Sequence, residues 1–130
     1  MVREVLKLIK DIHHPVAKRM IDVRISGARS RSIQRGKKGK DDAFELSTEY
    51  IMNLYVFQRG KCYMTKRPLS LNPNDTEVLS LDRKDPIFSY RQFNTGLTTK
   101  TNNLAKGNMT SQEYIDFLED THNRVNNINT

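Results

Sequence analysis

Cysteine is almost absent from this chain. Cys62 is the single one among 130 residues, so the protein has no intramolecular disulfide and cannot form a four-cysteine zinc site. No apolar run approaches the length of a membrane span, and the N-terminus lacks the apolar stretch of a signal peptide. These absences predict a soluble protein with no membrane partner, in a reducing and therefore cytoplasmic compartment.

Hydrophobic residues are also scarce, at 36% of the chain against 28% charged residues. A chain of this length and composition has room for one domain with a small core, and we expect part of it to depend on a partner for order.

Positive charge is concentrated in the first third of the chain. Residues 1–40 carry twelve Lys and Arg against three Asp and Glu, a balance of +9, whereas residues 41–130 carry ten against twelve, a balance of −2. An excess confined to one segment is typical of a nucleic-acid-binding arm, because each phosphate that a basic side chain neutralises releases condensed counterions. The alternative is a basic helix face that serves only solubility.

Apolar periodicity, helix breakers and cap residues predict five helices and two short strands. The helices are expected over residues 2–14, 16–35, 47–60, 99–107 and from 110 onward, and the strands over residues 78–82 and 95–98.

Four details of this pattern are specific enough to test. The second helix has a thin apolar stripe (Val16, Met20, Val23 and Ala28), so we expect it to lie on DNA or on a second protomer. Residues 36–42 read as a flexible linker. Ser47 is the expected N-cap of the third helix, with Phe57 on its buried face, and Thr110 with Glu113 forms a capping box before a frayed tail at 123–130.

The chemically informative residues lie late in the chain, where Ser80-Leu81-Asp82-Arg83-Lys84-Asp85 is followed by Asn94 and by Asn103-Leu104-Ala105-Lys106-Gly107. Mg²⁺ prefers oxygen ligands and usually takes only one or two from protein. Asp82 at a strand end and Asn103 on the next helix could supply them. From composition alone, ordinary turn and helix-cap roles for both residues remain the simpler interpretation.

Together with upstream segments, this stretch resembles a known family. The upstream segments are Ala28-Arg29-Ser30-Arg31, Phe44-Glu45-Leu46-Ser47, and Gln58 to Thr65 leading to Pro68-Leu69. In this order the set, over about residues 28–118, resembles the HNH (ββα-metal) endonuclease family, in its phage- and plasmid-associated subset.

The resemblance implies an α+β fold that is mainly helical, with a small ββα-metal finger made of a short antiparallel hairpin plus a helix. Together with the charge distribution and the helix pattern, it divides the chain into a basic helical N-terminal arm (1–40), an HNH-like nuclease domain (41–122) and a tail (123–130). Paired zinc-binding cysteines found in other HNH proteins are missing here, so the finger would be held by packing.

Site roles follow from the resemblance residue by residue. Asp82 and Asn103 would bind the metal, Asn94 would be the orienting Asn of the motif, and Lys106 would face a phosphate. Arg83 stands where the usual His acts as base. A guanidinium stays protonated, so Arg83 cannot be a normal base, but it can hold the scissile phosphate with two hydrogen bonds.

The sequence therefore does not identify the group that acts as general base. The candidates are Asp85, Tyr90, His122 folding back, or a metal-bound hydroxide with no dedicated protein base.

The sequence thus predicts a DNA endonuclease that depends on Mg²⁺ or Mn²⁺ and acts on double-stranded DNA in a bacterial cytosol if phage-encoded. The alternatives are a non-catalytic DNA-binding module on a degenerate HNH scaffold and an interaction protein whose N-terminal helices bind another protein. A homodimer through those helices is one arrangement this allows. The expected nucleic-acid contacts are Arg24, Arg29, Arg31, Arg35, Lys37, Lys38, Lys84 and Lys106.

Overall fold

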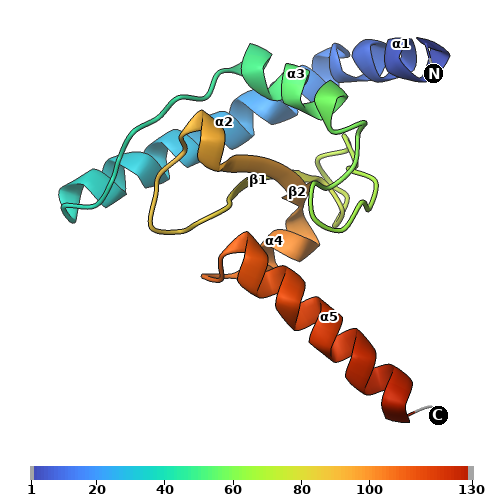
Figure 1. Ribbon diagram of the computed structural model, residues 1–130. Helices are drawn as coiled ribbons and strands as arrows, with labels where there is room; N and C mark the ends of the chain where they lie inside the picture. Colours follow the sequence, from blue (N-terminus) through green and yellow to red (C-terminus); the bar gives the residue numbers. More distant parts are fainter. Residues whose placement is uncertain (1, 129–130) are drawn as a thin grey trace.

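The computed structural model describes residues 2–128 as a mainly helical α+β protein, which confirms the expected fold class at that level (Figure 1). The described elements, in chain order, are α1 (Val2–Ile12), α2 (Pro15–Lys37), α3 (Thr48–Phe57), β1 (Leu79–Arg83), the 3₁₀ turn η1 (Gln92–Asn94), β2 (Thr95–Thr99), α4 (Lys100–Lys106) and α5 (Ser111–Ile128). None of the described helices is both long and apolar enough to cross a membrane.

Strands β1 and β2 form an antiparallel hairpin, and α4 begins immediately after it. In the register of the hairpin, Asp82 lies opposite Gly96 and Arg83 lies opposite Thr95. The side chain of Thr99 caps α4 by accepting a hydrogen bond from the backbone N–H of Asn102. The end of β1 and the start of α4 are thereby held in one small unit.

Helix α2 packs its apolar side into the hydrophobic core. For that side of the helix, the prediction that it lies on DNA or on a second protomer is wrong. Its buried apolar residues are Ala17, Met20, Ile21, Ile25 and Ala28. The predicted stripe is half right: Met20 and Ala28 are buried, whereas Val16 and Val23 are 50% and 63% exposed. The core that α2 enters also contains residues of α3 and of the hairpin, so residues 1–40 and 41–122 do not form separate cores.

Helix α3 begins as the sequence predicts. Ser47 accepts a hydrogen bond from the backbone N–H of Tyr50 at 3.1 Å, the geometry of an N-cap. The prediction for Phe57 is wrong: this ring is 81% exposed, and Tyr55, 5% exposed, faces the core instead. Helix α3 ends at Phe57, and Gly60 follows in a turn with a positive φ of 69°.

The segment between α2 and α3 is not the flexible linker that its composition indicates. The carboxylate of Asp41 accepts hydrogen bonds from Arg91 at 2.8 and 2.9 Å and from the backbone N–H of Ser89 at 2.9 Å. The backbone N–H of Glu45 also donates to the carbonyl of Tyr90. These contacts tie the segment to the loop between the two strands, which the local sequence could not reveal.

Helix α5 starts with the predicted capping box. The backbone N–H of Thr110 donates to Glu113 Oε1 at 2.9 Å, and the N–H of Glu113 donates to Thr110 Oγ1 at 3.1 Å. The frayed tail expected at 123–130 is helical through Ile128, with residues 129–130 outside the described range. Pairs four residues apart, Asp120 with Arg124 and His122 with Asn126, support this last part of a helix that extends away from the hairpin (Figure 1).

Candidate functional site

A cleft of about 490 Å³ lies between α2 and the hairpin with α4. Asp82 and Arg83 from β1 and Asn103 from α4 line it, together with Arg24 and Arg31 from α2. The structure thus brings both predicted metal ligands to one cleft, and it places basic side chains of α2 in that same cleft.

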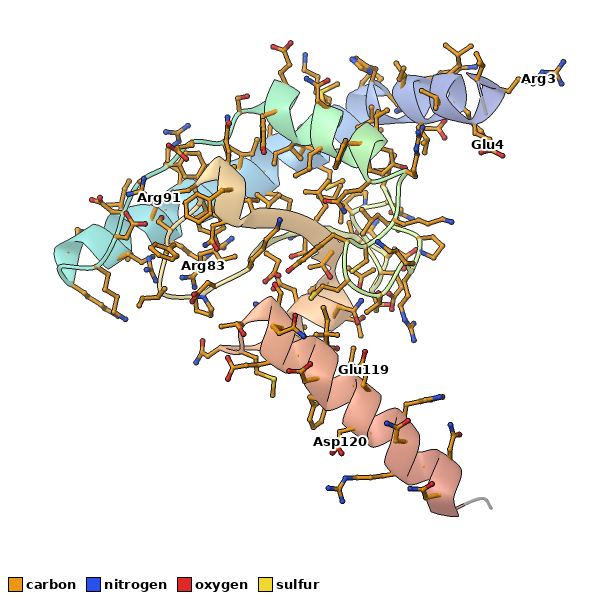
Figure 2. All side chains as sticks on the ribbon, viewed as in Figure 1. Arg3, Glu4, Arg83, Arg91, Glu119 and Asp120 are labelled. Carbon is orange, nitrogen blue, oxygen red and sulfur yellow. The ribbon has the colours of Figure 1, made fainter. Side chains whose placement is uncertain are left out.

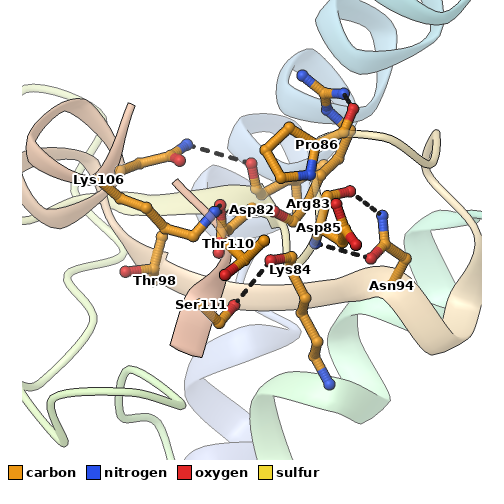
Figure 3. A network of polar contacts seen from close by, with 12 residues as sticks. Asp82, Arg83, Lys84, Asp85, Pro86, Asn94, Thr98, Lys106, Thr110 and Ser111 are labelled. Carbon is orange, nitrogen blue, oxygen red and sulfur yellow. Dashed lines mark hydrogen bonds and ion pairs between the residues drawn. The ribbon is translucent and has the colours of Figure 1, made fainter. Parts of the chain in front are cut away.

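Asp82 is almost fully enclosed, with a relative exposure of 3%. Its Oδ1 lies 3.1 Å from Lys106 Nζ, and its Oδ2 accepts a hydrogen bond from the hydroxyl of Tyr63 (Figure 3 shows the Lys106 side). The Tyr63 hydroxyl also bonds Ser111 Oγ at the start of α5. Burial raises the pKa of the Asp82 carboxyl, and the contacts with Tyr63 and Lys106 oppose that rise.

Tyr63 is the donor in this contact. Burial, followed by the proximity of Asp82, raises the pKa of the Tyr63 hydroxyl, which therefore remains protonated at neutral pH. Asp82 is consequently held from two sides, by an ammonium group and by a phenol.

Lys106 does not face a phosphate, and that part of the sequence prediction is wrong. Its side chain is 1% exposed, and Nζ donates to the backbone carbonyl of Arg83 at 2.9 Å besides pairing with Asp82. The aliphatic stem of Lys106 passes through the interior, so the ammonium balances the Asp82 charge from inside the protein.

Asn103 is oriented by β1. Its Nδ2 donates to Ser80 Oγ at 2.8 Å and to the backbone carbonyl of Leu81 at 3.2 Å. Because a carbonyl can only accept, the amide nitrogen must face the strand, and Oδ1 is the atom of this side chain with which Asn103 could coordinate a cation. Asn103 lines the cleft beside Asp82.

These two residues fit a hard divalent cation. The oxygens of Asp82 and Asn103 suit Mg²⁺ or Mn²⁺, which need only one or two protein ligands when water and phosphate supply the others. Within residues 2–128 no group of three or more His, Cys, Asp or Glu side chains is arranged to hold a metal. Both Asp82 oxygens already have a protein partner, but each has a second lone pair.

Arg83 leaves β1 toward the loop. Its Nη1 donates to the carbonyls of Pro86 at 2.7 Å and Phe88 at 3.4 Å, and its guanidinium lies 5.8 Å from the ring centre of Tyr90. These contacts fix one nitrogen and leave further N–H donors of the fork for a ligand. Figure 2 shows Arg83 on the α2 side of the hairpin, away from Glu119 and Asp120 on α5.

Asn94 is buried and does not line the cleft. Its Oδ1 accepts from the backbone N–H of Asp85, and its Nδ2 donates to the carbonyls of Asp85, Phe88 and Ser89 (Figure 3). The predicted orienting Asn therefore holds the loop after β1 in shape, rather than touching a substrate.

The three side chains considered as general base have different positions. Asp85 does not line the cleft of Asp82, and its Oδ1 accepts from the backbone N–H of Ile87. Tyr90 lines the cleft, and its hydroxyl accepts from Arg31 Nε at 3.0 Å. His122 lies on α5 and bonds Asn126, so the idea that it folds back to the site is wrong.

The other predicted nucleic-acid contacts are distributed more widely. Arg35 lines a second cleft, Arg29 stacks 4.4 Å above the ring of Phe44, and Lys84 Nζ lies 5.5 Å from the ring of Tyr63. Lys37 and Lys38 are exposed at the end of α2.

Sequence reasoning missed Tyr63, Ser111 and Lys100, the last of which lines the cleft. One signal could have indicated Tyr63. Gly96 lies inside β2, and a Cβ there would come within 2.5 Å of the Tyr63 ring. A glycine inside a strand often marks such a close approach.

Comparison of the chain with protein-family models, with curated proteins and with solved structures finds no match. The residues of the cleft and the resemblance of the motifs are therefore the basis on which a function can be proposed.

Proposed function

We propose that the chain is a metal-dependent endonuclease that hydrolyses phosphodiester bonds of double-stranded DNA, with Mg²⁺ or Mn²⁺ bound by Asp82 and Asn103. In this proposal β1, β2 and α4 form the ββα-metal finger of the HNH family. The preference for DNA follows from the family resemblance.

The observation that carries the proposal is the composition of a single cleft. Asp82 and Asn103 present oxygen atoms there, and Arg24, Arg31 and Arg83 line the same space. A phosphodiester carries negative charge, and its hydrolysis needs positive groups near the phosphate and a means to activate water. Cation ligands and arginines in one cleft meet the first requirement.

Each protein group has a defined part in the reaction. Lys106 and Tyr63 hold the Asp82 carboxylate, and Ser80 with the Leu81 carbonyl turns the Asn103 amide. Arg83 donates to the scissile phosphate with the N–H groups that Pro86 and Phe88 leave unused, and so stabilises charge that develops in the transition state.

No protein side chain is assigned as general base. Among the three candidates only Tyr90 lines the cleft, and its hydroxyl already accepts a hydrogen bond from Arg31. The metal ion, when bound, supplies charge neutralisation and the activation of water.

A second candidate function is a DNA-binding module without catalysis. The observation that favours it is the near-complete enclosure of Asp82, whose two oxygens are both engaged by Lys106 and Tyr63. A carboxylate satisfied in this way could serve only the fold.

Plasmid nicking with Mg²⁺ or Mn²⁺ distinguishes the two functions. We expect the wild type to nick DNA, Asp82→Asn and Asn103→Ala to lose nicking, and His13→Ala, an exposed residue away from the cleft, to keep it. Circular dichroism verifies that each variant folds, and Mn²⁺ affinity measured without DNA should fall in the first two variants alone. Absence of nicking with either metal, together with DNA affinity unchanged in Asp82→Asn, would establish the binding module instead.

A further inference from the structure

A second cleft, of about 570 Å³, lies on the other side of Arg83. Arg83 and Pro86 line both clefts, so the two are neighbours that share one wall. The remaining lining residues of the second cleft are Arg35, Lys40, Asp41, Ile87 and Asn108.

The second cleft is lined by three cationic side chains and one carboxylate. Among the ion pairs of residues 2–128, none involves Arg35, Lys40 or Arg83. The one carboxylate in the lining, Asp41, is bound by Arg91 through both oxygens. The cleft thus contains three cationic side chains and a single carboxylate, and that carboxylate already forms an ion pair with Arg91.

The two guanidinium groups are held in place by neutral acceptors. Arg35 donates from Nε to the carbonyl of Asp41 at 2.8 Å and from Nη2 to the carbonyl of Ile87 at 3.0 Å. Arg83 donates to Pro86 and Phe88 carbonyls in the same loop. These bonds orient the guanidinium groups. The pKa of Arg35 is lowered by burial and then by repulsion from Arg83, while attraction to Asp41 opposes this shift.

The arginines of α2 follow the same path. Arg24 and Arg31 line the first cleft and Arg35 lines the second, with spacings of seven and four residues that keep all three on one side of the helix. Eleven residues of helix extend about 16 Å, which is long enough to follow several nucleotides of a strand.

We propose that the second cleft is a phosphate subsite, in which Arg35, Lys40 and Arg83 bind a backbone phosphate of the same DNA strand whose scissile phosphate lies in the first cleft. This inference rests on the proposed function, because it identifies the first cleft as the place of hydrolysis. It assigns Arg83 to both phosphates and gives the strand a direction along α2.

The test measures DNA binding in EDTA, so that it does not depend on cleavage. Removing one phosphate-binding side chain reduces the slope of log K against log salt by about 0.9 for duplex DNA. We expect Arg35→Gln and Lys40→Gln each to reduce the slope by about that amount. Lys18→Gln, which removes the same charge from an exposed site of α2 outside both clefts, should leave it unchanged.

The Arg35 side chain also donates to two backbone carbonyls, so Arg35→Gln can affect folding as well as DNA binding. A second measurement therefore uses Lys40→Gln instead. Duplexes with one neutral methylphosphonate linkage at successive positions should weaken wild-type binding at a position beside the scissile one. Lys40→Gln, which alters an exposed side chain, should lose sensitivity at that same position. Coupling of this kind requires direct contact rather than a general change in charge.

The inference is overturned if Arg35→Gln and Lys40→Gln retain the slope of Lys18→Gln, or if all three variants reduce it equally. If the wild type nicks DNA but the slopes behave in either of these ways, the endonuclease proposal is supported and only the phosphate subsite is rejected. Conversely, reduced slopes in a chain that never nicks DNA would support the subsite while the endonuclease proposal fails.

Discussion

Asp82 and Lys106 form an ion pair with side-chain exposures of only 3% and 1%. Removing two charges from water costs several kcal/mol, so a buried pair of this kind is a poor device for stability alone. The pair fixes a carboxylate at the floor of the cleft and balances its charge. Such a departure from an apolar interior is expected at a functional site.

A substitution at Gly96 tests whether the packing of Tyr63 against β2 positions Asp82. In Gly96→Ala the new Cβ would lie 2.5 to 2.6 Å from ring atoms of Tyr63. We expect a loss of about 1–3 kcal/mol in the free energy of unfolding, because a crowded interior must shift. Urea denaturation measures this loss, and nicking should decrease because Tyr63 moves from Asp82.

The matched control for that variant is Gly27→Ala on α2, where a Cβ would meet only Arg31 Nη1 at 3.4 Å. Alanine is favoured over glycine in a helix by roughly 1 kcal/mol, so this control should be as stable as the wild type or more so. If Gly96→Ala behaved like Gly27→Ala, the close contact between Tyr63 and β2 would be wrong.

At the scale of elements, α2 is the central helix of the core rather than an appendage. Replacing a buried Met or Ile by Ala typically costs about 2–5 kcal/mol, so Met20, Ile21 and Ile25 together contribute an amount similar to the whole stability of a typical domain, about 5–15 kcal/mol. We therefore expect a chain beginning at Asp41 to be unfolded. Circular dichroism and NMR dispersion measure this, and a folded product would show that residues 41–130 fold independently of residues 1–40.

The Asp41 carboxylate is one of the groups that hold the segment from Lys38 to Ser47 in place. Arg91 and the backbone N–H of Ser89 lower the pKa of Asp41 below its ordinary value of 3.8. A carboxyl with a lowered folded-state pKa stabilises the fold above its ordinary pKa, and this contribution is lost as the pH falls through the folded pKa. We expect the wild type to lose stability below about pH 3.8 more steeply than Asp41→Asn does.

Denaturant midpoints measured between about pH 2 and 6 would test this expectation. The exposed neighbour Asp42 provides the control, since Asp42→Asn removes a similar charge and should retain the wild-type profile. An unchanged profile in Asp41→Asn would contradict the role of the Arg91 contact.

At the scale of the whole molecule, charge is divided between the two ends of the chain. Arg24, Arg31 and Arg35 of α2 line the two clefts, whereas α5 extends away from them with Glu113, Asp116, Glu119 and Asp120 (Figure 2). This polarity favours an approach of DNA along α2, because the acidic helix repels phosphate.

Helix α1 gives the expected homodimer a physical basis. Val2, Leu6 and Ile9 lie on one side of α1 and are 72%, 59% and 39% exposed. We expect Leu6→Asp to be monomeric by sedimentation and the wild type to be larger, because an aspartate in an apolar contact would remain unpaired. Ile33→Asp, at an exposed apolar position on α2, is the control, and a monomeric wild type would contradict the dimer.

Much of the local structure could be predicted from sequence. Ser47, Thr99 and the Thr110–Glu113 box are caps made by residues close in the chain, and the strands and the start of α4 follow from short patterns. Asp82 and Asn103 were found by their motifs, and the structure places both in one cleft. The predictions for Phe57, Val16 and Val23 are wrong because the burial of a helix face depends on neighbours from elsewhere in the chain.

The sequence by itself determined the elements, the basic first third and the identity of the two candidate ligands, because caps, periodicity and charge are properties of nearby residues. Only the tertiary structure decided that Lys106 is buried against Asp82, that Tyr63 completes this contact, and that α2 closes the cleft. Those contacts join positions nineteen or more residues apart, and they form only when the core brings α2, the hairpin and α4 together.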